Sequence, residues 1–155
     1  MDTLGVIRRA TIAAWSALAL LVVAAGQNAL AQSGLPIRNI QVDVAPLRAS
    51  AGDPTASWVQ ERMPEQLAKA LAGRMSPQGN TLVVRIDYLT LGPLKDSRAW
   101  DNISGVAMLG GVQRPVRATS RYWASAIDQT EFEQSNHRRV MEAVQALTYW
   151  LARDL

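Results

Sequence analysis

TLVVRIDYL, residues Thr81–Leu89, is the stretch that decides the fold of this chain of 155 residues. Its side chains alternate along a period of two, which is typical of a β-strand with one face in a core. One face would carry Leu82, Val84, Ile86 and Tyr88, and the other Val83, Arg85, Asp87 and Leu89. Gly92-Pro93 follows and ends the pattern, because proline cannot donate to a strand ladder.

Three further segments show strand patterns on either side of this one. Ile37–Val44 precedes it, a weaker strand spans residues 102–112, and another spans Val116–Ala124. Gly110-Gly111 marks a turn or bulge between the last two. The chain is therefore expected to form a sheet of four strands.

A helix is expected between the first strand and Thr81. Asp53-Pro54 is a typical start, with an N-cap acceptor followed by proline at the first helical position. An apolar stripe then recurs every four residues, formed by Val59, Met63, Leu67, Leu71 and Met75. Pro64 interrupts it, so residues 54–75 form either one kinked helix or two short helices. The preceding segment, Leu47–Gly52, is expected to be a loop.

A second amphipathic helix is expected at the end of the sequence. Ser135 would cap it, and an apolar stripe runs along it, formed by Val140, Val144, Leu147 and Leu151. The element order is then β-α-β-β-β-α. This order predicts an α+β fold, a two-layer sandwich in which two helices cover one face of a four-stranded mixed sheet.

The first 31 residues have the pattern of a secretory signal peptide. Arg8 and Arg9 precede the apolar run Ala10–Ala25, and Ala29-Leu30-Ala31 supplies the small residues of a cleavage site. We expect residues 32–36 to be a flexible lead and residues 37–155 to be a single periplasmic domain. The alternative is a retained segment that anchors the protein in the inner membrane, although the run is shorter than the roughly 20 residues of a spanning helix.

Composition excludes several classes of chemistry. The chain has no cysteine and one histidine, which excludes disulfides, thiolate metal sites, cysteine nucleophiles and histidine-rich metal centres. Its 16 cations and 13 anions give a net charge of +3, too small a surplus to indicate a nucleic-acid partner. No phosphate-binding glycine motif occurs. We therefore expect no metal, no cofactor and no nucleic acid.

The strongest functional pattern is a group of arginines with tryptophan. Arg117, Arg121 and Trp123 alternate on one face of the last expected strand, Arg114 lies nearby, and Trp100 lies in a polar loop. Such a surface favours a partner in the cell envelope: a protein, a glycan or an anionic lipid headgroup. The alternative is that the same residues form a solvated sheet face. The leading hypothesis is a non-enzymatic binding or accessory module.

Two other hypotheses stay open. His137 could act as the base of a small hydrolase or lyase, with Asp128 or Glu131 as its carboxylate partner. The apolar stripe of the terminal helix could instead complete a homodimer.

The layout resembles small exported proteins of alphaproteobacteria, through Thr81–Leu89, residues 125–130 and Ser135–Leu155. More distantly it resembles the amino-terminal domain of the Tol–Pal system's periplasmic protein and the lipopolysaccharide-assembly lipoprotein. The matching part is Gln41–Leu47 followed by a helix and Leu82-Val83-Val84. A lipoprotein would carry a cysteine at its cleavage site, and this chain has none. The resemblance implies a fold and an envelope compartment, and no activity.

Overall fold

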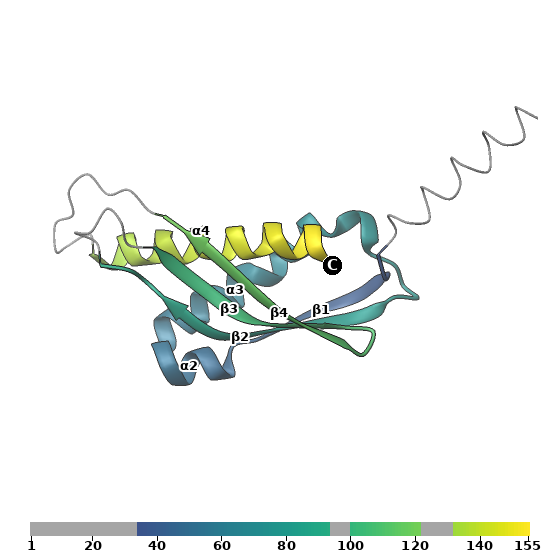
Figure 1. Ribbon diagram of the computed structural model, residues 1–155, viewed down its shortest axis with the longest axis horizontal. Coiled ribbons are helices and arrows are strands. Elements are labelled where there is room, and N and C mark those ends of the chain that lie inside the picture. Colours follow the sequence, from purple (N-terminus) through teal and green to yellow (C-terminus); the bar gives the residue numbers. More distant parts are fainter. Residues whose placement is uncertain (1–33, 94–99, 122–131) are drawn as a thin grey trace, which may run out of the picture. The chain divides into compact units, whose positions relative to one another are not determined.

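A mixed four-stranded sheet and three α-helices form the unit that extends from Leu35 to Leu155 (Figure 1). The computed structural model describes residues 34–93, 100–121 and 132–155. In chain order its elements are β1 (Ile37–Asp43), α2 (Ala45–Ala51), α3 (Asp53–Ala70), the 3₁₀ turn η1 (Ala72–Arg74), β2 (Asn80–Thr90), β3 (Asp101–Leu109), β4 (Val112–Ser120) and α4 (Phe132–Asp154).

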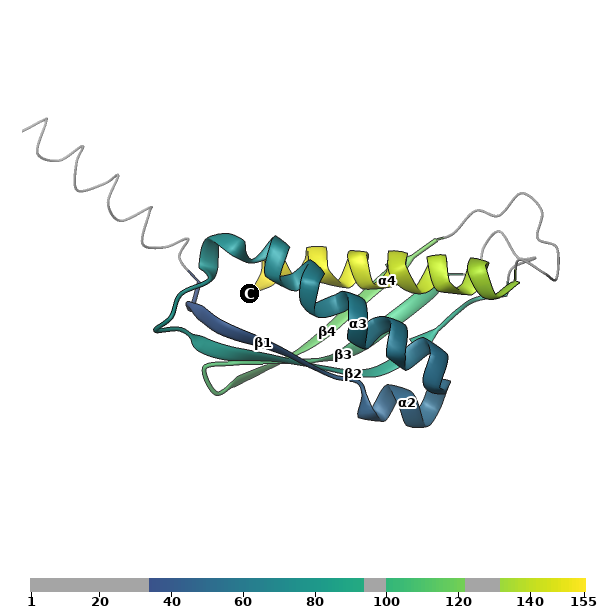
Figure 2. The same ribbon diagram turned by 180° about the vertical axis from the view of Figure 1, so that it is seen from behind.

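The sheet has the strand order β1-β2-β3-β4, in which β1 and β2 are parallel and the other neighbours are antiparallel. The helices α3 and α4 lie over the same face of this sheet (Figure 2). The predicted α+β fold, a two-layer sandwich with a mixed sheet, is thereby confirmed. The opposite face, which we call the open face, is covered by no described helix.

The core lies between the helices and the sheet, and both predicted stripes face it. Val59, Met63 and Leu67 of α3 are fully buried. The stripe of α4, which was a candidate dimer surface, is buried within this one chain from Val140 to Leu151. Met75, the last member of the expected α3 stripe, is 40% exposed because the α-helix ends at Ala70 and η1 breaks its periodicity.

The prediction of a loop at Leu47–Gly52 was wrong, because most of this segment belongs to the short helix α2. Pro46 lies in the first turn of α2, where a helix leaves its backbone N–H groups unpaired and a proline costs no hydrogen bond. Asp43 Oδ1 accepts a hydrogen bond of 2.9 Å from the N–H of Ala45. Leu47 is fully buried, so packing against the core stabilises a helix too short to persist alone.

Residues 53–70 form one helix, with Pro64 inside it. This decides between the two alternatives for Pro64. The N-cap is Gly52, one position before the expected cap Asp53, which is the first helical residue. Asp53 Oδ1 instead accepts a 3.3 Å hydrogen bond from the hydroxyl of Ser57.

Up to Ile86 the side chains of β2 lie on the faces of the strand that the sequence predicts. After Ile86 they lie on the opposite faces. The register with β3 shifts between Ile86 and Tyr88, so that Tyr88 is 64% exposed while Leu89 is buried. A bulge inserts one extra residue, and with a period of two this moves every later side chain to the other face. The strands approach closely here: a Cβ on Gly105 would lie 1.9 Å from the carbonyl oxygen of Arg85.

The last strand begins four residues earlier than expected, at Val112. Gly110 and Gly111 have positive φ angles of 58° and 82° and form a two-residue turn between Leu109 and Val112, which pair with each other. Glycine adopts these angles without steric cost, which makes this a tight hairpin. Residues 122–124, the end of the expected strand, lie outside the described residues.

The helix α4 is described from Phe132 onward, so Ser135 lies within it and is buried, and it is not the cap that we expected. No described helix combines the length and apolar character needed to cross a membrane. Residues 1–33, including the expected signal peptide and the first two residues of the expected lead, lie outside the described residues.

Candidate functional site

The candidate binding surface lies on the open face, where β3 and β4 pair. We call Trp100, Asn102, Arg117 and Arg121 the Arg/Trp surface. Asn102 pairs with Thr119 and Ser104 pairs with Arg117, which places these side chains on neighbouring strands. The ring of Trp100 is stacked by the guanidinium of Arg121, at 4.1 Å from the ring centroid. Trp100 is 48% exposed.

Hydrogen bonds connect the other members of this surface. Arg117 Nη2 donates to Asn102 Oδ1 over 3.2 Å, and Asn102 Nδ2 donates to the carbonyl of Trp100 over 3.2 Å. Among the described residues Arg117 forms no ion pair with a carboxylate. The surface therefore presents positioned guanidinium groups beside an aromatic ring, an arrangement suited to a carboxylate or phosphate.

The structure separates Arg114, one of the five sequence-predicted residues, from this group. Arg114 pairs with the buried Ala107 and lies on the helix-covered face, because positions 114 and 117 have opposite parity in a strand. Its Nη1 donates 2.8 Å to the carbonyl of Asp154 at the end of α4. Trp123 lies outside the described residues.

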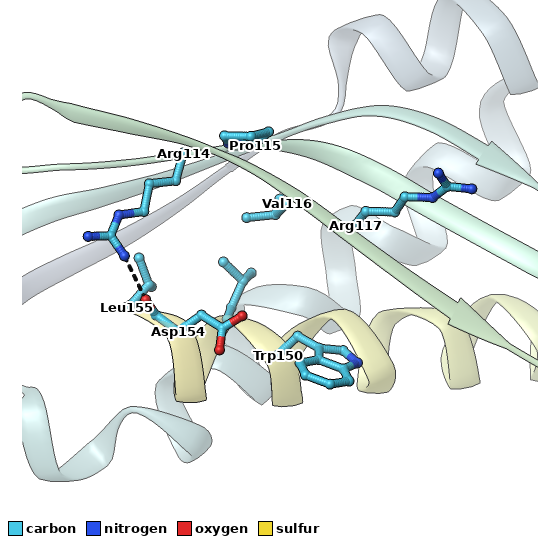
Figure 3. A pocket seen from close by; sticks show the side chains of 8 residues that line it. Arg114, Pro115, Val116, Arg117, Trp150, Asp154 and Leu155 are labelled. Carbon is cyan, nitrogen blue, oxygen red and sulfur yellow. Dashed lines mark hydrogen bonds between the residues drawn. The ribbon is translucent and has the colours of Figure 1, made fainter.

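A pocket of about 210 Å³ opens between β4 and the last turns of α4 (Figure 3). Val116 of β4 and Leu151 of α4 line it, together with Trp150, which is 39% exposed. The guanidinium of Arg153 lies 3.8 Å from the centroid of the Trp150 ring. The other residues that line the pocket are Arg114, Pro115, Arg117, Asp154 and Leu155. The pocket thus has an apolar floor bordered by the guanidinium groups of Arg114 and Arg117 and by the carboxylate of Asp154, which pairs with Arg153, and it can take an apolar side chain.

A further arginine of the open face, Arg85, is already paired. Arg85 of β2 donates from Nε to Asp87 Oδ1 over 2.7 Å. This hydrogen bond and the charge of Asp87 raise the pKa of Arg85. Arg85 is thus part of a local ion pair, whereas Arg117 of β4 forms none within the described residues.

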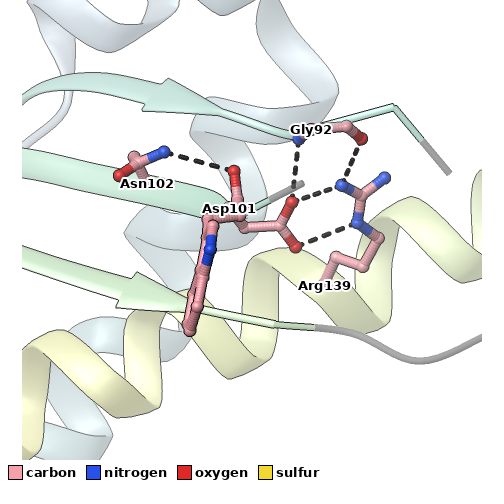
Figure 4. A network of polar contacts seen from close by, with 5 residues as sticks. Gly92, Asp101, Asn102 and Arg139 are labelled. Carbon is pink, nitrogen blue, oxygen red and sulfur yellow. Dashed lines mark hydrogen bonds and ion pairs between the residues drawn. The ribbon is translucent and has the colours of Figure 1, made fainter. Parts of the chain in front are cut away.

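Sequence reasoning missed a buried ion pair at the end of the sheet (Figure 4). Arg139 of α4 donates from Nε to Asp101 Oδ2 over 2.9 Å and from Nη2 to Asp101 Oδ1. The same Nη2 donates 2.5 Å to the carbonyl of Gly92, whose N–H donates 2.9 Å to Asp101 Oδ1. Asp101 and Arg139 are 2% and 5% exposed. The network ties α4 to the end of β2 and the start of β3.

A signal for this pair existed in the sequence. Arg139 continues the row Ala143, Leu147 and Leu151, whose members are four residues apart and buried. Asp101 lies one residue before the strand expected over residues 102–112, and in the structure it is the first residue of β3. Close to this pair, partial burial raises the pKa of Glu142, and the charge of Asp101 raises it further.

His137, the candidate base, packs edge-on against Trp58 of α3, with 4.9 Å between ring centroids. Its candidate partners, Asp128 and Glu131, lie outside the described residues. No group of three or more His, Cys, Asp or Glu side chains in the described ranges is placed to hold a metal ion.

No protein-family model matches this sequence, and no curated protein matches it significantly. Among solved structures, the chain is similar to a minor lipoprotein from Acinetobacter baumannii, whose crystal structure was determined at 2.35 Å. The two are 13% identical, the alignment covers 78% of this chain and 92% of that chain, and the TM-score is 0.42.

Proposed function

We propose that this protein is a non-enzymatic accessory module of the bacterial cell envelope, which binds an anionic partner on the Arg/Trp surface. The observation that carries the proposal is the placement of Trp100, Arg117 and Arg121 together on the face that no described helix covers. The signal pattern of residues 1–31 supports export to the periplasm.

The chemistry of the surface favours a partner that bears carboxylates or phosphates. Guanidinium groups bind both kinds of anion through paired hydrogen bonds, and these charge-assisted bonds are stronger than neutral ones. Stacking on Trp100 and bonding to Asn102 restrict Arg121 and Arg117 before binding, which lowers the entropy lost when the partner arrives. An envelope protein, an acidic glycan and an anionic headgroup share this chemistry.

The test combines capture with charge reversal. The tagged full chain is expressed in a bacterial host, crosslinked in intact cells and purified, and the attached components are identified by mass spectrometry. Arg117→Glu with Arg121→Glu is compared with a control, Arg38→Glu with Arg138→Glu, which makes the same charge change on exposed residues elsewhere. We expect at least one acidic component to be retained by wild type and control and to fall more than tenfold in the first variant.

Two outcomes would contradict the proposal. If both double variants retain every component equally, the Arg/Trp surface does not bind the partner. Recovery of the protein from the cytoplasm with residues 1–31 attached would remove the envelope setting. The mass of the purified protein and its release by osmotic shock decide the second point.

A further inference from the structure

The outer edge of β4 is a regular strand edge that no other strand of the described sheet covers. β4 is the last strand of the order β1-β2-β3-β4, and its pairing with β3 runs without a register shift. Leu109 and Val112 flank a two-residue turn, so each donates a backbone hydrogen bond to the other. Backbone N–H groups along a strand point alternately toward the neighbouring strand and away from it. Those of Gln113, Arg117 and Thr119 therefore point outward, away from β3. These groups are unpaired ladder positions.

Pro115 lies at one of these outward-pointing backbone positions. A proline is tolerated in a strand where its nitrogen points away from the ladder, and Pro115 lies two residues from Gln113 and from Arg117. It removes one outward donor and leaves the outward carbonyls in place. The edge can therefore pair with an added strand, with one hydrogen bond fewer than a full ladder.

Side chains beside this edge divide into two kinds. On the helix side lies the pocket of about 210 Å³, which Val116 of β4 and Trp150 of α4 line (Figure 3). On the open face lie Arg117 and Arg121. The segment Val112–Arg121 contains three arginines and no acidic residue. An added strand would thus meet an apolar pocket on one side and cations on the other.

We infer that an extended acidic segment of a partner protein adds to β4 as a fifth strand, in the groove between β4 and α4. Its side chains alternate, since strands have a period of two. One apolar side chain enters the pocket beside Trp150, and aspartate or glutamate at the alternate positions contact Arg117 and Arg121. The inference rests on the proposed function and names its partner: a peptide segment, bound by strand addition.

The same features oppose a second copy of this chain at this edge. Two β4 strands side by side would bring arginines of like charge together, and such cross-strand pairs are destabilising. Charge complementarity therefore favours an acidic segment.

The probe is a fluorescein-labelled peptide of alternating aspartate and valine with one phenylalanine in a central valine position. Fluorescence anisotropy measures its binding to the protein. The protein is expressed from the full-length sequence and purified in the form that the host cell produces. Trp150→Ala removes a pocket wall, and Gln113→Pro removes an outward donor in the same phase as Pro115. Phe132→Ala changes an exposed aromatic residue at the other end of α4, which does not line the pocket. Circular dichroism checks that each variant folds.

We expect Kd to rise at least tenfold in Trp150→Ala and at least fivefold in Gln113→Pro, and to change less than twofold in Phe132→Ala. Backbone N–H groups of Gln113 and Thr119 should gain protection from hydrogen exchange when the peptide binds. Replacing aspartate by lysine in the peptide should abolish binding.

Three results would overturn the inference: no binding of the aspartate peptide at millimolar concentration, equal binding of the lysine peptide, or binding insensitive to both Trp150→Ala and Gln113→Pro. The proposed function fails separately. If the partner captured in cells is lost in Arg117→Glu with Arg121→Glu and kept in Gln113→Pro and Trp150→Ala, the Arg/Trp surface stands and strand addition is wrong.

Discussion

Arg139 is the residue whose burial demands the most explanation. Removing a guanidinium from water costs several kcal/mol, which only close and complete hydrogen bonding can offset. Here Asp101 binds it through both oxygens, and Gly92 supplies a carbonyl and an N–H to the same cluster. The pair therefore specifies where α4 meets β3, and it contributes less net stability than its contacts indicate.

This account predicts different outcomes for single and double substitutions. Arg139→Met alone leaves the Asp101 carboxylate buried without its cation and should lower the free energy of unfolding by about 3–5 kcal/mol. Arg139→Met with Asp101→Leu should recover part of that loss, because no buried charge is left unpaired, although the N–H and carbonyl of Gly92 lose their partners. Urea denaturation gives both values. A double variant as unstable as the single one would contradict this account.

At the scale of elements, α3 shows how packing accommodates an unfavourable residue. Pro64 lies inside the helix and cannot donate to the carbonyl of Gln60, four residues before it. Gln60 is exposed, so water can bind that carbonyl. Val59, Met63 and Leu67 are fully buried on the other side and hold both halves of the helix on the sheet.

Pro64→Ala should therefore stabilise the protein, by up to about 3 kcal/mol, which is the cost of proline in a helix interior. The gain is smaller if the proline bend helps α3 to follow the twist of the sheet. Thermal melts should show a rise of several degrees, whereas Glu61→Ala, an exposed change in the same helix, should shift the melting temperature by much less. Unchanged or lower stability of Pro64→Ala would contradict the expectation that Pro64 destabilises the continuous helix α3.

At the scale of the whole unit, one core joins all four strands and all three α-helices. Its buried members come from the first strand, at Ile37, to the last helix, at Leu151. Because no element buries its apolar face without the others, the described unit should unfold in a single cooperative step.

Leu147→Ala tests this cooperativity. Leu147 is fully buried, and its truncation should lower the free energy of unfolding by about 2–5 kcal/mol through lost burial and a residual cavity. Tryptophan fluorescence and far-ultraviolet circular dichroism should give the same urea midpoint in wild type and variant, with an unchanged m value. Separate midpoints for the two signals would show that α4 unfolds independently.

The sequence was sufficient for the fold class and for most faces of the elements. Periods of two and of four are local properties, and burial of the resulting apolar faces leaves few arrangements. The bulge after Ile86 and the helix α2 were missed. The first depends on how β3 presents Gly105, and the second on a core position for Leu47. For the candidate site, the sequence identified Trp100, Arg117 and Arg121 but placed Arg114 with them.

The sequence by itself determined the strand and helix patterns, the exclusion of cysteine chemistry and the concentration of arginine in Val112–Arg121. Tertiary structure alone decided which of these arginines act together. Parity directs Arg114 to the end of α4, a stacked ring holds Arg121, and Asn102 on the neighbouring strand holds Arg117. It alone also paired Asp101 with Arg139, 38 residues apart. Local patterns set the direction of a side chain, but its partner is set by register and packing between distant segments.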